Sequence, residues 1–446
     1  MKGFKAYDIR GIFNSDFNSD DVYRLGYFLP ELSPTNKVLV GRDVRESSDE
    51  IFASLLRGLT DRGVDVYDVG LATTPMVYYL TGKYDFKLSV QITASHNPKE
   101  YNGFKISGEK VLPIGFDNGL NKLRELVHSG NIVPADKKGA RIDFNVTDEY
   151  VKFLRNYIPG DLSSLKIGID CSNGMAGLFI KELLGDQPHY INLQPDGRFP
   201  NHEPNPLEPD NQEDIKALVK KEQCDIGVIF DGDGDRVMFI DEHGEFISPD
   251  LIIAFLGHYF LTNPGEKVLQ DIRSSKSVQE YLEKFQANVY TWKVGRAYAA
   301  SRLKEIDGIY GGELAGHYYF KDFYYSDSGI MAALIVLGIT SKFKKQGKPI
   351  SSIIGDIKNY TSSGEINFKI EEKLDAIEAV KDYYIQNNKP LKILDFDGYR
   401  LEFADWWFNI RPSNTEPYLR LIVEAKNEEL LNLKVEEIKK LIRPYF

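Results

Sequence analysis

Short apolar segments alternate with amphipathic segments through most of this 446-residue chain, and this alternation constrains its fold more than any other feature. In the first part, the strands expected at 37–40, 64–69 and 88–93 are separated by helices expected at 49–61 and 75–83. Such βαβ units build parallel strands, whose carboxyl ends and following loops lie along one edge of a sheet. Ligands usually bind at that edge, so these loops are the first candidates for a functional site.

The same alternation recurs twice before the pattern changes. A second series begins after the polar stretch 137–141, and a third ends in an apolar helix expected at 330–343. Beyond it, strands with tight connections and two helices indicate an antiparallel sheet. At about 150 residues per domain, the length allows roughly three domains, with two or four also possible. The pattern favours three related α/β domains and one α+β domain, with expected bounds of 1–143, 144–245, 246–355 and 356–446.

The composition argues against nucleic acid or a membrane as a partner. Lys and Arg number 55 against 66 Asp and Glu, a net charge of −11 spread along the chain, whereas either partner would need a basic patch. The longest apolar run, 330–339, has about half the length of a membrane-spanning helix. The N-terminus lacks the apolar centre of a secretory signal.

Cys171 and Cys224 lie at apolar segments and fit reduced core thiols. We expect a soluble, globular, cytoplasmic protein, either a monomer or a homodimer.

The strongest local motif is DGDGDR at 231–236, directly after a strand expected at 225–230 and before a buried strand expected at 237–240. Asp231, Asp233 and Asp235 can converge on one hard cation, and the absence of a nearby sulfur ligand favours Mg²⁺ or Ca²⁺. An EF-hand loop would need Gly at its sixth position, where Arg236 stands, and an aspartate-nucleophile phosphatase would need Thr in place of Asp235. An ordinary acidic turn is disfavoured because three facing carboxylates repel one another. Water or a phosphate oxygen should complete the coordination of the cation.

A second candidate loop is TASHNP at 93–98, which follows another expected strand. Ser95 and His96 are adjacent, but adjacent side chains on an extended backbone point to opposite faces. Adjacency therefore does not make them a nucleophile and its base. Lys105, ten positions after Ser95, could return to the same site. Taken alone, the loop fits an ordinary turn equally well, and a single Lys is usually a surface charge.

Two later loops carry groups suited to a sugar phosphate. In GGELAGH at 311–317, Glu313 and His317 are four positions apart in a Gly-rich turn, where backbone can approach a ligand closely. Carboxylate and imidazole groups suit sugar hydroxyls. The segment RPSNTEPYLR at 411–420 combines guanidinium, hydroxyl and amide groups, which together bind a phosphate dianion. Either segment could still be an ordinary connection. Arg10 and Arg296 are further candidates, each more often structural when taken singly.

Taken together and in this order, these loops closely resemble those of the α-D-phosphohexomutase superfamily, in particular its phosphomannomutase/phosphoglucomutase branch. The resemblance covers essentially the whole chain and also includes the segments 6–11, 101–105 and 195–202. It implies an α/β fold of four domains around a central cleft, the first three with mixed sheets, each domain contributing one loop. It further implies that phosphate moves between O1 and O6 of a hexose, mannose or glucose, through a hexose 1,6-bisphosphate that is both activator and intermediate.

The resemblance also implies a role for each matching residue. One Mg²⁺ per chain would be held by the three aspartates of 231–236 together with an oxygen of phosphorylated Ser95. The other residues near the transferring phosphoryl group would be Arg10, His96, Arg236 and Lys105, with Lys105 as the acid/base candidate. The substrate, a hexose phosphate, would be bound by Arg296, Glu313, Ala315, His317, Arg411, Ser413, Asn414, Thr415 and Arg420.

Two departures from the family pattern bear on substrate preference. Ala315 stands where many members carry Ser, and Arg296 stands where some carry His. The nearest alternative is the phosphoglucosamine mutase branch. Its sugar loop tends to Gln-Ser where this chain has Leu314 and Ala315, so Leu314 favours the hexose branch. An alternative of a different class is a non-catalytic relative that binds sugar phosphate or Ca²⁺. Such a relative would be expected to have lost Ser95 or a metal carboxylate, and all are present.

Overall fold

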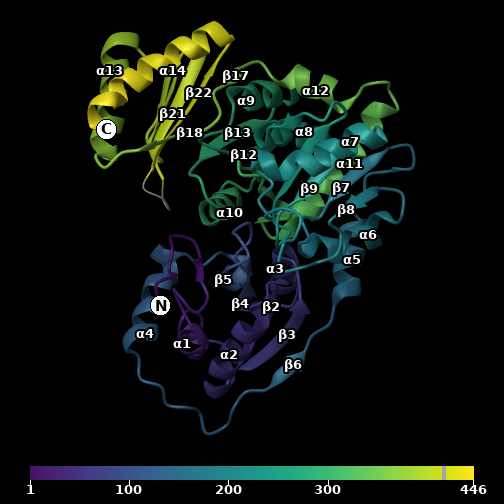
Figure 1. The fold of residues 1–446 in the computed structure, drawn as a ribbon, viewed down its shortest axis with the longest axis vertical. Helices are drawn as coiled ribbons and strands as arrows, with labels where there is room; N and C mark the ends of the chain where they lie inside the picture. Colours follow the sequence, from purple (N-terminus) through teal and green to yellow (C-terminus); the bar gives the residue numbers. More distant parts are fainter. Residues whose placement is uncertain (414–417) are drawn as a thin grey trace.

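The computed structural model describes residues 1–413 and 418–446, which form four sheets in succession along the chain (Figure 1). The first sheet has the order β1-β5-β4-β2-β3-β6 and is mixed, because β5 runs antiparallel to β4 and β1 antiparallel to β5. Its strands are β1 Ile9–Ile12, β2 Lys37–Arg42, β3 Asp65–Leu71, β4 Ser89–Ile92, β5 Tyr101–Ser107 and β6 Arg141–Asp143. Its helices are α1 Ser19–Phe28, α2 Ser48–Asp61, α3 Thr74–Lys83 and α4 Asn121–Ser129. In α2, Ile51, Leu55 and Leu59 recur at every fourth position and are buried.

The second sheet has the order β11-β10-β9-β7-β8, with β9, β7 and β8 parallel and β10 and β11 antiparallel. Its strands are β7 Ile167–Asp170, β8 His189–Ile191, β9 Ile226–Phe230, β10 Val237–Asp241 and β11 Phe246–Ile247. Its helices are α5 Thr147–Arg155, α6 Ile180–Leu184 and α7 Glu213–Glu222. The aspartate motif forms the turn between β9 and β10. The turn follows a strand, as the sequence predicted, and β9 is buried along its whole length.

The third sheet, β13-β12-β14-β15-β16, is also mixed. Its strands are β12 Lys267–Asp271, β13 Asn288–Trp292, β14 Tyr310–Gly312, β15 Tyr318–Phe320 and β16 Ser326–Asp327. Its helices are α8 Pro249–Phe260, α9 Lys276–Leu282, α10 Arg296–Glu305, α11 Gly329–Lys344 and α12 Ile350–Ile357. The apolar helix α11 packs against α8 and also against β9 and β10 of the second sheet. It is apolar on all sides because both neighbours cover it.

The fourth sheet is antiparallel, as expected, with the order β17-β22-β21-β20-β19 and with β18 also paired to β22. Its strands are β17 Thr361–Ser362, β18 Ile366–Lys369, β19 Lys392–Leu394, β20 Tyr399–Glu402, β21 Trp406–Pro412 and β22 Tyr418–Ala425. Helices α13 Lys373–Asn388 and α14 Glu428–Ile442 cover one face of this sheet (Figure 1).

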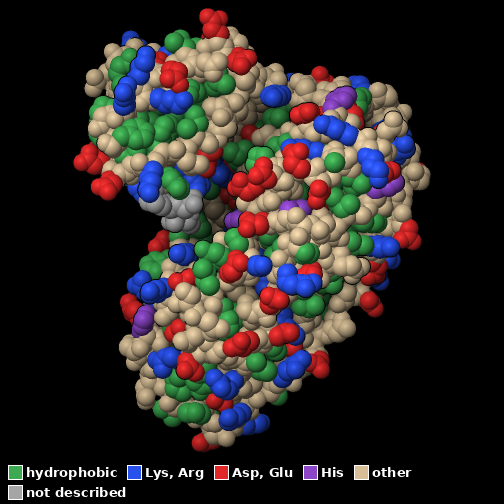
Figure 2. All heavy atoms as spheres, viewed as in Figure 1, with side chains coloured by type: hydrophobic (Ala, Val, Ile, Leu, Met, Phe, Trp, Pro, Cys, Tyr) green, Lys and Arg blue, Asp and Glu red, His purple; other side chains and the backbone are tan. Residues whose placement is uncertain are grey.

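The apolar core divides the molecule unevenly. One cluster joins part of the first domain to the second and third, from Leu39 to Ile357, and a separate cluster from Ile9 to Val127 fills the rest of the first domain. The core of the fourth domain spans Phe368 to Ile442. The fourth domain forms a separate lobe, and a hollow lies between this lobe and the first domain (Figure 2). The first three domains are therefore joined through a shared apolar cluster, which among the described residues contains none beyond Ile357.

Two expectations about the chain can be checked directly. Cys171 and Cys224 are both buried and unpaired, which confirms that they are core thiols. Within residues 1–413 and 418–446, no helix combines the length and the apolar character that crossing a membrane requires.

Candidate active site

Ser95 lies in the loop after β4 and reaches the aspartate motif of the second domain. Its Oγ donates a hydrogen bond to Asp231 Oδ2 over 2.8 Å, and its backbone N donates to Thr93 Oγ1 over 2.9 Å. The φ angle of Ser95 is +52°, in the left-handed region that non-glycine residues seldom adopt. The serine loop and the aspartate motif, which are far apart in the sequence, thus form one site.

The three aspartates of the motif are fully buried and offer oxygen atoms that all lie within 4.8 Å of one another. Asp233 Oδ1 and Asp235 Oδ1 have no hydrogen-bond partner among the described residues. Burial, and then the charges of these two neighbours, raise the pKa of Asp231 well above its usual value. Unpaired carboxylate oxygens and mutual repulsion are what a bound divalent cation would relieve. The donor set therefore fits Mg²⁺.

Lys105, on β5, supplies a positive charge to this cluster. Its Nζ lies 2.6 Å from Asp233 Oδ2 and also contacts Asp235 Oδ2. Burial opposes the charge of Lys105, but the carboxylates of Asp233 and Asp235 outweigh it, so the pKa of Lys105 is raised. Thr74, at the start of α3, donates from its hydroxyl to the same oxygen of Asp233. Lys105 is therefore a cation that shares two carboxylates with any metal ion bound there.

Arg10 contacts the serine loop, and His96 lies within it next to Ser95. Arg10, on β1, donates from Nη1 to Asn97 Oδ1 over 2.6 Å and pairs with Asp8 over 2.5 Å. His96 Nδ1 is buried and has no hydrogen-bond partner within the described part of the chain. Burial of the ring, and then the nearby arginines, lower the pKa of His96 well below its usual value, so this ring is neutral at neutral pH. The hydroxyl of Ser95 is bonded to Asp231, in agreement with the view that adjacency does not pair it with His96.

A chain of polar contacts links the aspartate motif to the loop at 311–317. Arg236 Nε donates to His317 Nε2 over 3.0 Å, and His317 Nδ1 lies 2.6 Å from Asp327 Oδ2. Because arginine can only donate, Nε2 is the acceptor and Nδ1 carries the proton that Asp327 accepts. Asp327 also accepts from Arg296 Nε over 2.8 Å. Sequence reasoning missed Asp327, because its two-residue strand β16 carries no motif.

Glu313 and Ala315 lie in the turn between β14 and β15. Both oxygens of Glu313 are occupied, since Oε1 accepts from Gly295 N over 2.6 Å and Oε2 accepts from Tyr319 OH over 2.5 Å. Gly295 has a φ of +121° and directly precedes Arg296, so Glu313 fixes the start of α10. Ala315 is half-buried in the turn. The structure thus brings Arg296, Glu313 and His317 together beside the aspartate motif.

The phosphate-binding candidates of the fourth domain lie in the separate lobe. Arg411, at the end of β21, is buried and lies 3.4 Å from Glu365 Oε2, while Arg420 on β22 pairs with Glu365 Oε1 over 3.2 Å. Burial, and then the charge of Arg273, lower the pKa of Arg411. Ser413 is buried at the end of the same strand. Two further predicted residues lie outside the described part of the chain, namely Asn414 and Thr415.

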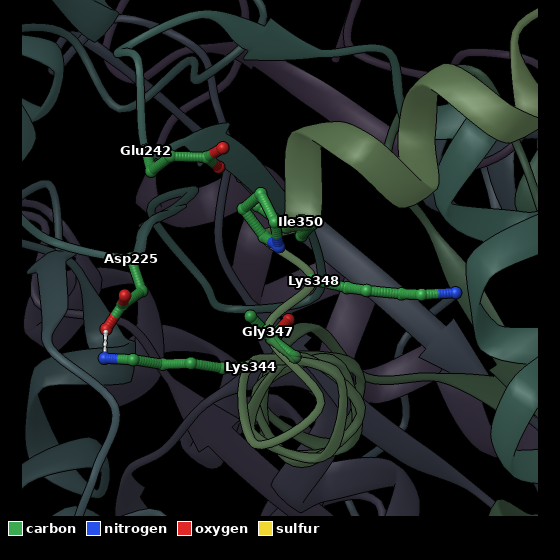
Figure 3. Close-up of a pocket in the computed structure, with 8 residues that line it drawn as sticks. Asp225, Glu242, Lys344, Gly347, Lys348 and Ile350 are labelled. Atoms are coloured by element: carbon green, nitrogen blue, oxygen red, sulfur yellow. Dashed lines mark hydrogen bonds and ion pairs between the residues drawn. The ribbon is translucent and has the colours of Figure 1, made fainter.

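A second hollow, with a volume of about 230 Å³, lies at the end of α11 (Figure 3). Its charged side chains are either paired with a neighbouring group or directed away from the cavity. Lys344 pairs with Asp225 over 2.6 Å, Glu242 accepts from Ser351 N at the start of α12, and Lys348 extends away from both (Figure 3). The cavity therefore offers no unpaired group that indicates a ligand, and the loops around Ser95 remain the candidate site.

Comparison with known proteins identifies the family of the chain. Models of the phosphoglucomutase/phosphomannomutase family match four successive stretches: alpha/beta/alpha domains I, II and III at 1–130, 148–244 and 248–360, and the C-terminal domain at 365–441. The phosphomannomutase of Methanocaldococcus jannaschii is 36% identical over 447 residues, covering 98% of this chain and 97% of that protein.

Solved structures show the same fold. A phosphoglucomutase/phosphomannomutase family protein from Burkholderia thailandensis superimposes with a TM-score of 0.90 at 28% identity, covering 100% of this chain and 97% of that chain. An N-acetylphosphoglucosamine mutase from Aspergillus fumigatus, solved with GlcNAc-6P and magnesium, has a TM-score of 0.56 at 15% identity, covering 93% of this chain and 84% of that chain.

The four matching domains and the relatives named phosphomannomutase define a phosphohexomutase. Within that class, the chain belongs to the phosphoglucomutase/phosphomannomutase family. The fold class and the general activity predicted from the sequence are confirmed.

Proposed function

We propose that this protein interconverts hexose 1-phosphate and hexose 6-phosphate, with mannose and glucose phosphates as substrates, through phosphorylated Ser95 and a hexose 1,6-bisphosphate. The observation that carries this proposal is the contact between Ser95 Oγ and Asp231, at the edge of three buried aspartates. A phosphoryl acceptor beside a cation site is what this transfer requires. Relatives named phosphomannomutase support the choice of sugar.

In the first transfer, the bond between Ser95 Oγ and phosphorus breaks as a free sugar hydroxyl forms its own bond to phosphorus and loses its proton. The bisphosphate then turns, and its other phosphoryl group returns to Ser95 Oγ. Asp231, Asp233 and Asp235 would hold one Mg²⁺ per chain, which when bound offsets negative charge on the phosphoryl oxygens. Arg10 and Arg236 would stabilise charge that develops during transfer, and His96, within the serine loop, would lie near the same phosphoryl group.

Lys105 is the proposed group for moving the proton of the sugar hydroxyl. It contacts the aspartates, and its raised pKa keeps it protonated while that contact lasts. To accept a proton, it must first leave these carboxylates and lose its own proton. While paired with the aspartates, Lys105 therefore holds the proton that the leaving oxygen of the sugar needs, and it can release that proton only once a change at the site lowers its pKa.

The non-reacting end of the substrate would be bound by the third and fourth domains. Arg411, Ser413 and Arg420 would bind the phosphate that is not transferred, with Asn414 and Thr415 in the same segment. Arg296, Glu313, Ala315 and His317 would face the sugar. Binding energy from the remote phosphate can then position the reacting hydroxyl. Because the bisphosphate must turn without escaping, we propose that the fourth domain closes over the hollow.

The test is turnover of mannose 1-phosphate, glucose 1-phosphate and glucosamine 1-phosphate, each with Mg²⁺ and a trace of hexose 1,6-bisphosphate. We expect the first two to be converted to their 6-phosphates and the activity to disappear with a chelator. Conversion of glucosamine 1-phosphate alone would contradict the proposed sugar, and conversion of none would contradict the function. The bounds of the four domains, a cytoplasmic location and a monomeric or dimeric state remain predictions.

A further inference from the structure

The Arg45 side chain is fully buried behind the serine loop and uses every one of its five N–H donors there. It lies in the turn between β2 and α2. Nε donates to Asp43 Oδ2 over 3.1 Å. The other four donors go to backbone carbonyl groups of the serine loop and the residues after it, at distances of 2.6 to 3.0 Å: those of Ser95, Asn97, Pro98 and Tyr101.

The serine loop needs such support because its backbone is strained at Ser95. A non-glycine residue with a φ of +52° persists only where its surroundings hold it in place. Within the loop, the supports are local: Ser95 N donates to Thr93 Oγ1, and Asn97 N donates to Ala94 O. The bond from Arg45 Nη2 to the Ser95 carbonyl fixes the orientation of the peptide plane that follows Ser95.

Residues of the first and the second domain both hold Arg45 in place. Asp43 Oδ1 accepts from Arg45 N over 3.0 Å and from Ser48 Oγ over 2.7 Å. From the second domain, the Phe199 ring lies 5.0 Å from the guanidinium carbon. A Cβ added to Gly197 would lie only 2.2 Å from Val44 O, so the segment 195–202 packs directly on the Arg45 turn. The proposed function assigns no role to the segment 195–202. Its role in this inference is to cover Arg45.

The loop that Arg45 binds also positions Arg10. Arg45 Nη2 donates to the Asn97 carbonyl, and the side chain of the same Asn97 accepts from Arg10 Nη1 over 2.6 Å. A displacement of the loop would therefore move both the Ser95 hydroxyl and the Arg10 guanidinium. The Ser95 hydroxyl would lose its hydrogen bond to Asp231, and the Arg10 guanidinium would lose its fixed direction.

We propose that Arg45 is a positioning residue for the phosphoryl-accepting serine, holding the Ser95 hydroxyl and Arg10 in line with the aspartate site through four carbonyl groups of one loop. The inference rests on the proposed function, because it assigns Ser95 the phosphoryl group. Lysine could not substitute, since its three donors share one nitrogen and cannot span four carbonyl groups as the planar guanidinium does.

The experiment compares Arg45→Lys and Arg45→Met with the wild type. Arg42→Met is the matched control, because Arg42 lies three residues earlier and pairs with Asp49 and Asp68 rather than with the serine loop. We expect kcat to fall about 10- to 100-fold in Arg45→Lys and further in Arg45→Met, as misplaced reacting groups do. KM for hexose 1-phosphate should stay within about threefold, because ground-state binding is unchanged. Arg42→Met should keep the wild-type kcat.

Hydrogen exchange gives a readout that does not depend on activity. Backbone amides in 93–101 should exchange faster in Arg45→Lys than in the wild type, while those of α1 and β3 should not. An unchanged kcat, a loss confined to KM, or unchanged exchange in 93–101 would overturn the inference. Should the Arg45 variants fail to fold, Asp43→Asn must show the same changes at smaller size, and their absence there overturns it equally.

The two proposals can fail separately. If the wild type converts no hexose phosphate, the proposed function and the catalytic part of this inference fall together. Faster exchange confined to 93–101 would still confirm that Arg45 holds the loop. If the wild type is active and the Arg45 variants match it, only the inference about Arg45 is overturned.

Discussion

Replacing Glu424 with Gln should stabilise the protein at alkaline pH and have little effect near pH 4.5. Glu424, on β22, is buried at the junction between the third and fourth domains, where its Oε2 accepts from Ser275 Oγ over 2.7 Å and from Trp407 Nε1 over 2.9 Å. Burial, and then the charge of Asp250, raise the pKa of Glu424 from its usual 4.5 to about 7. An ionised Glu424 is therefore a cost to the folded state.

The size of the effect follows from the two pKa values. Between pH 4.5 and 7 the folded state keeps a proton that the unfolded state releases, so the free energy of unfolding falls as pH rises through this window. At about 1.4 kcal/mol per pH unit, the loss amounts to about 3 kcal/mol and is complete above pH 7. Glutamine keeps a carbonyl oxygen that can accept from Ser275 and Trp407, but it carries no charge. The variant should avoid most of this loss.

Urea unfolding followed by tryptophan fluorescence measures this difference. Trp407 donates to Glu424, and the Trp292 ring lies 5.2 Å from the ring of Phe396 in the fourth domain, so these two report on the junction. Trp406 lies in the core of the fourth domain and reports on its unfolding. We expect the stability gain of Glu424→Gln to grow between pH 5 and pH 8. Glu429→Gln, an exposed change on α14, controls for the loss of one charge. A gain that is the same at every pH would refute the reasoning.

Three further predictions follow from the site. Lys105→Met should lower kcat at least tenfold yet bind Mg²⁺ more tightly by calorimetry, because the ammonium no longer shares Asp233; weaker binding would contradict this. Asp327→Asn should raise KM for hexose 1-phosphate about tenfold, since Arg296 and His317, which would face the sugar, both lose their anionic acceptor; wild-type kinetics would count against the contact. Small-angle scattering should show a smaller radius of gyration with bound hexose phosphate, and no compaction would exclude closure of the fourth domain.

The sequence predicted those parts of the site that are local in the chain. The DGDGDR motif lies between two strands that could be predicted from their own residues, so the aspartates and the turn that carries them were found together. The antiparallel fourth domain was found in the same way, from strands separated by tight turns.

What the sequence did not predict depends on contacts between distant segments. Arg45 acts on carbonyl groups, which every residue carries, at positions 50 to 56 residues further along the chain, so no side-chain pattern marks it. Asp327 joins the site because β16 pairs with β15 beside His317. The apolar pattern of α11 identified a buried helix, but not that it packs against the second sheet.

The most direct test of the central claim is the rate of hexose 1-phosphate conversion by Ser95→Ala beside the wild type, with Mg²⁺ and a trace of hexose 1,6-bisphosphate. If phosphate passes through Ser95, removal of its Oγ should lower the rate at least about 100-fold. Mass spectrometry of the wild-type protein should find phosphate on the peptide that contains Ser95. A Ser95→Ala variant that turns over at near the wild-type rate would contradict the account.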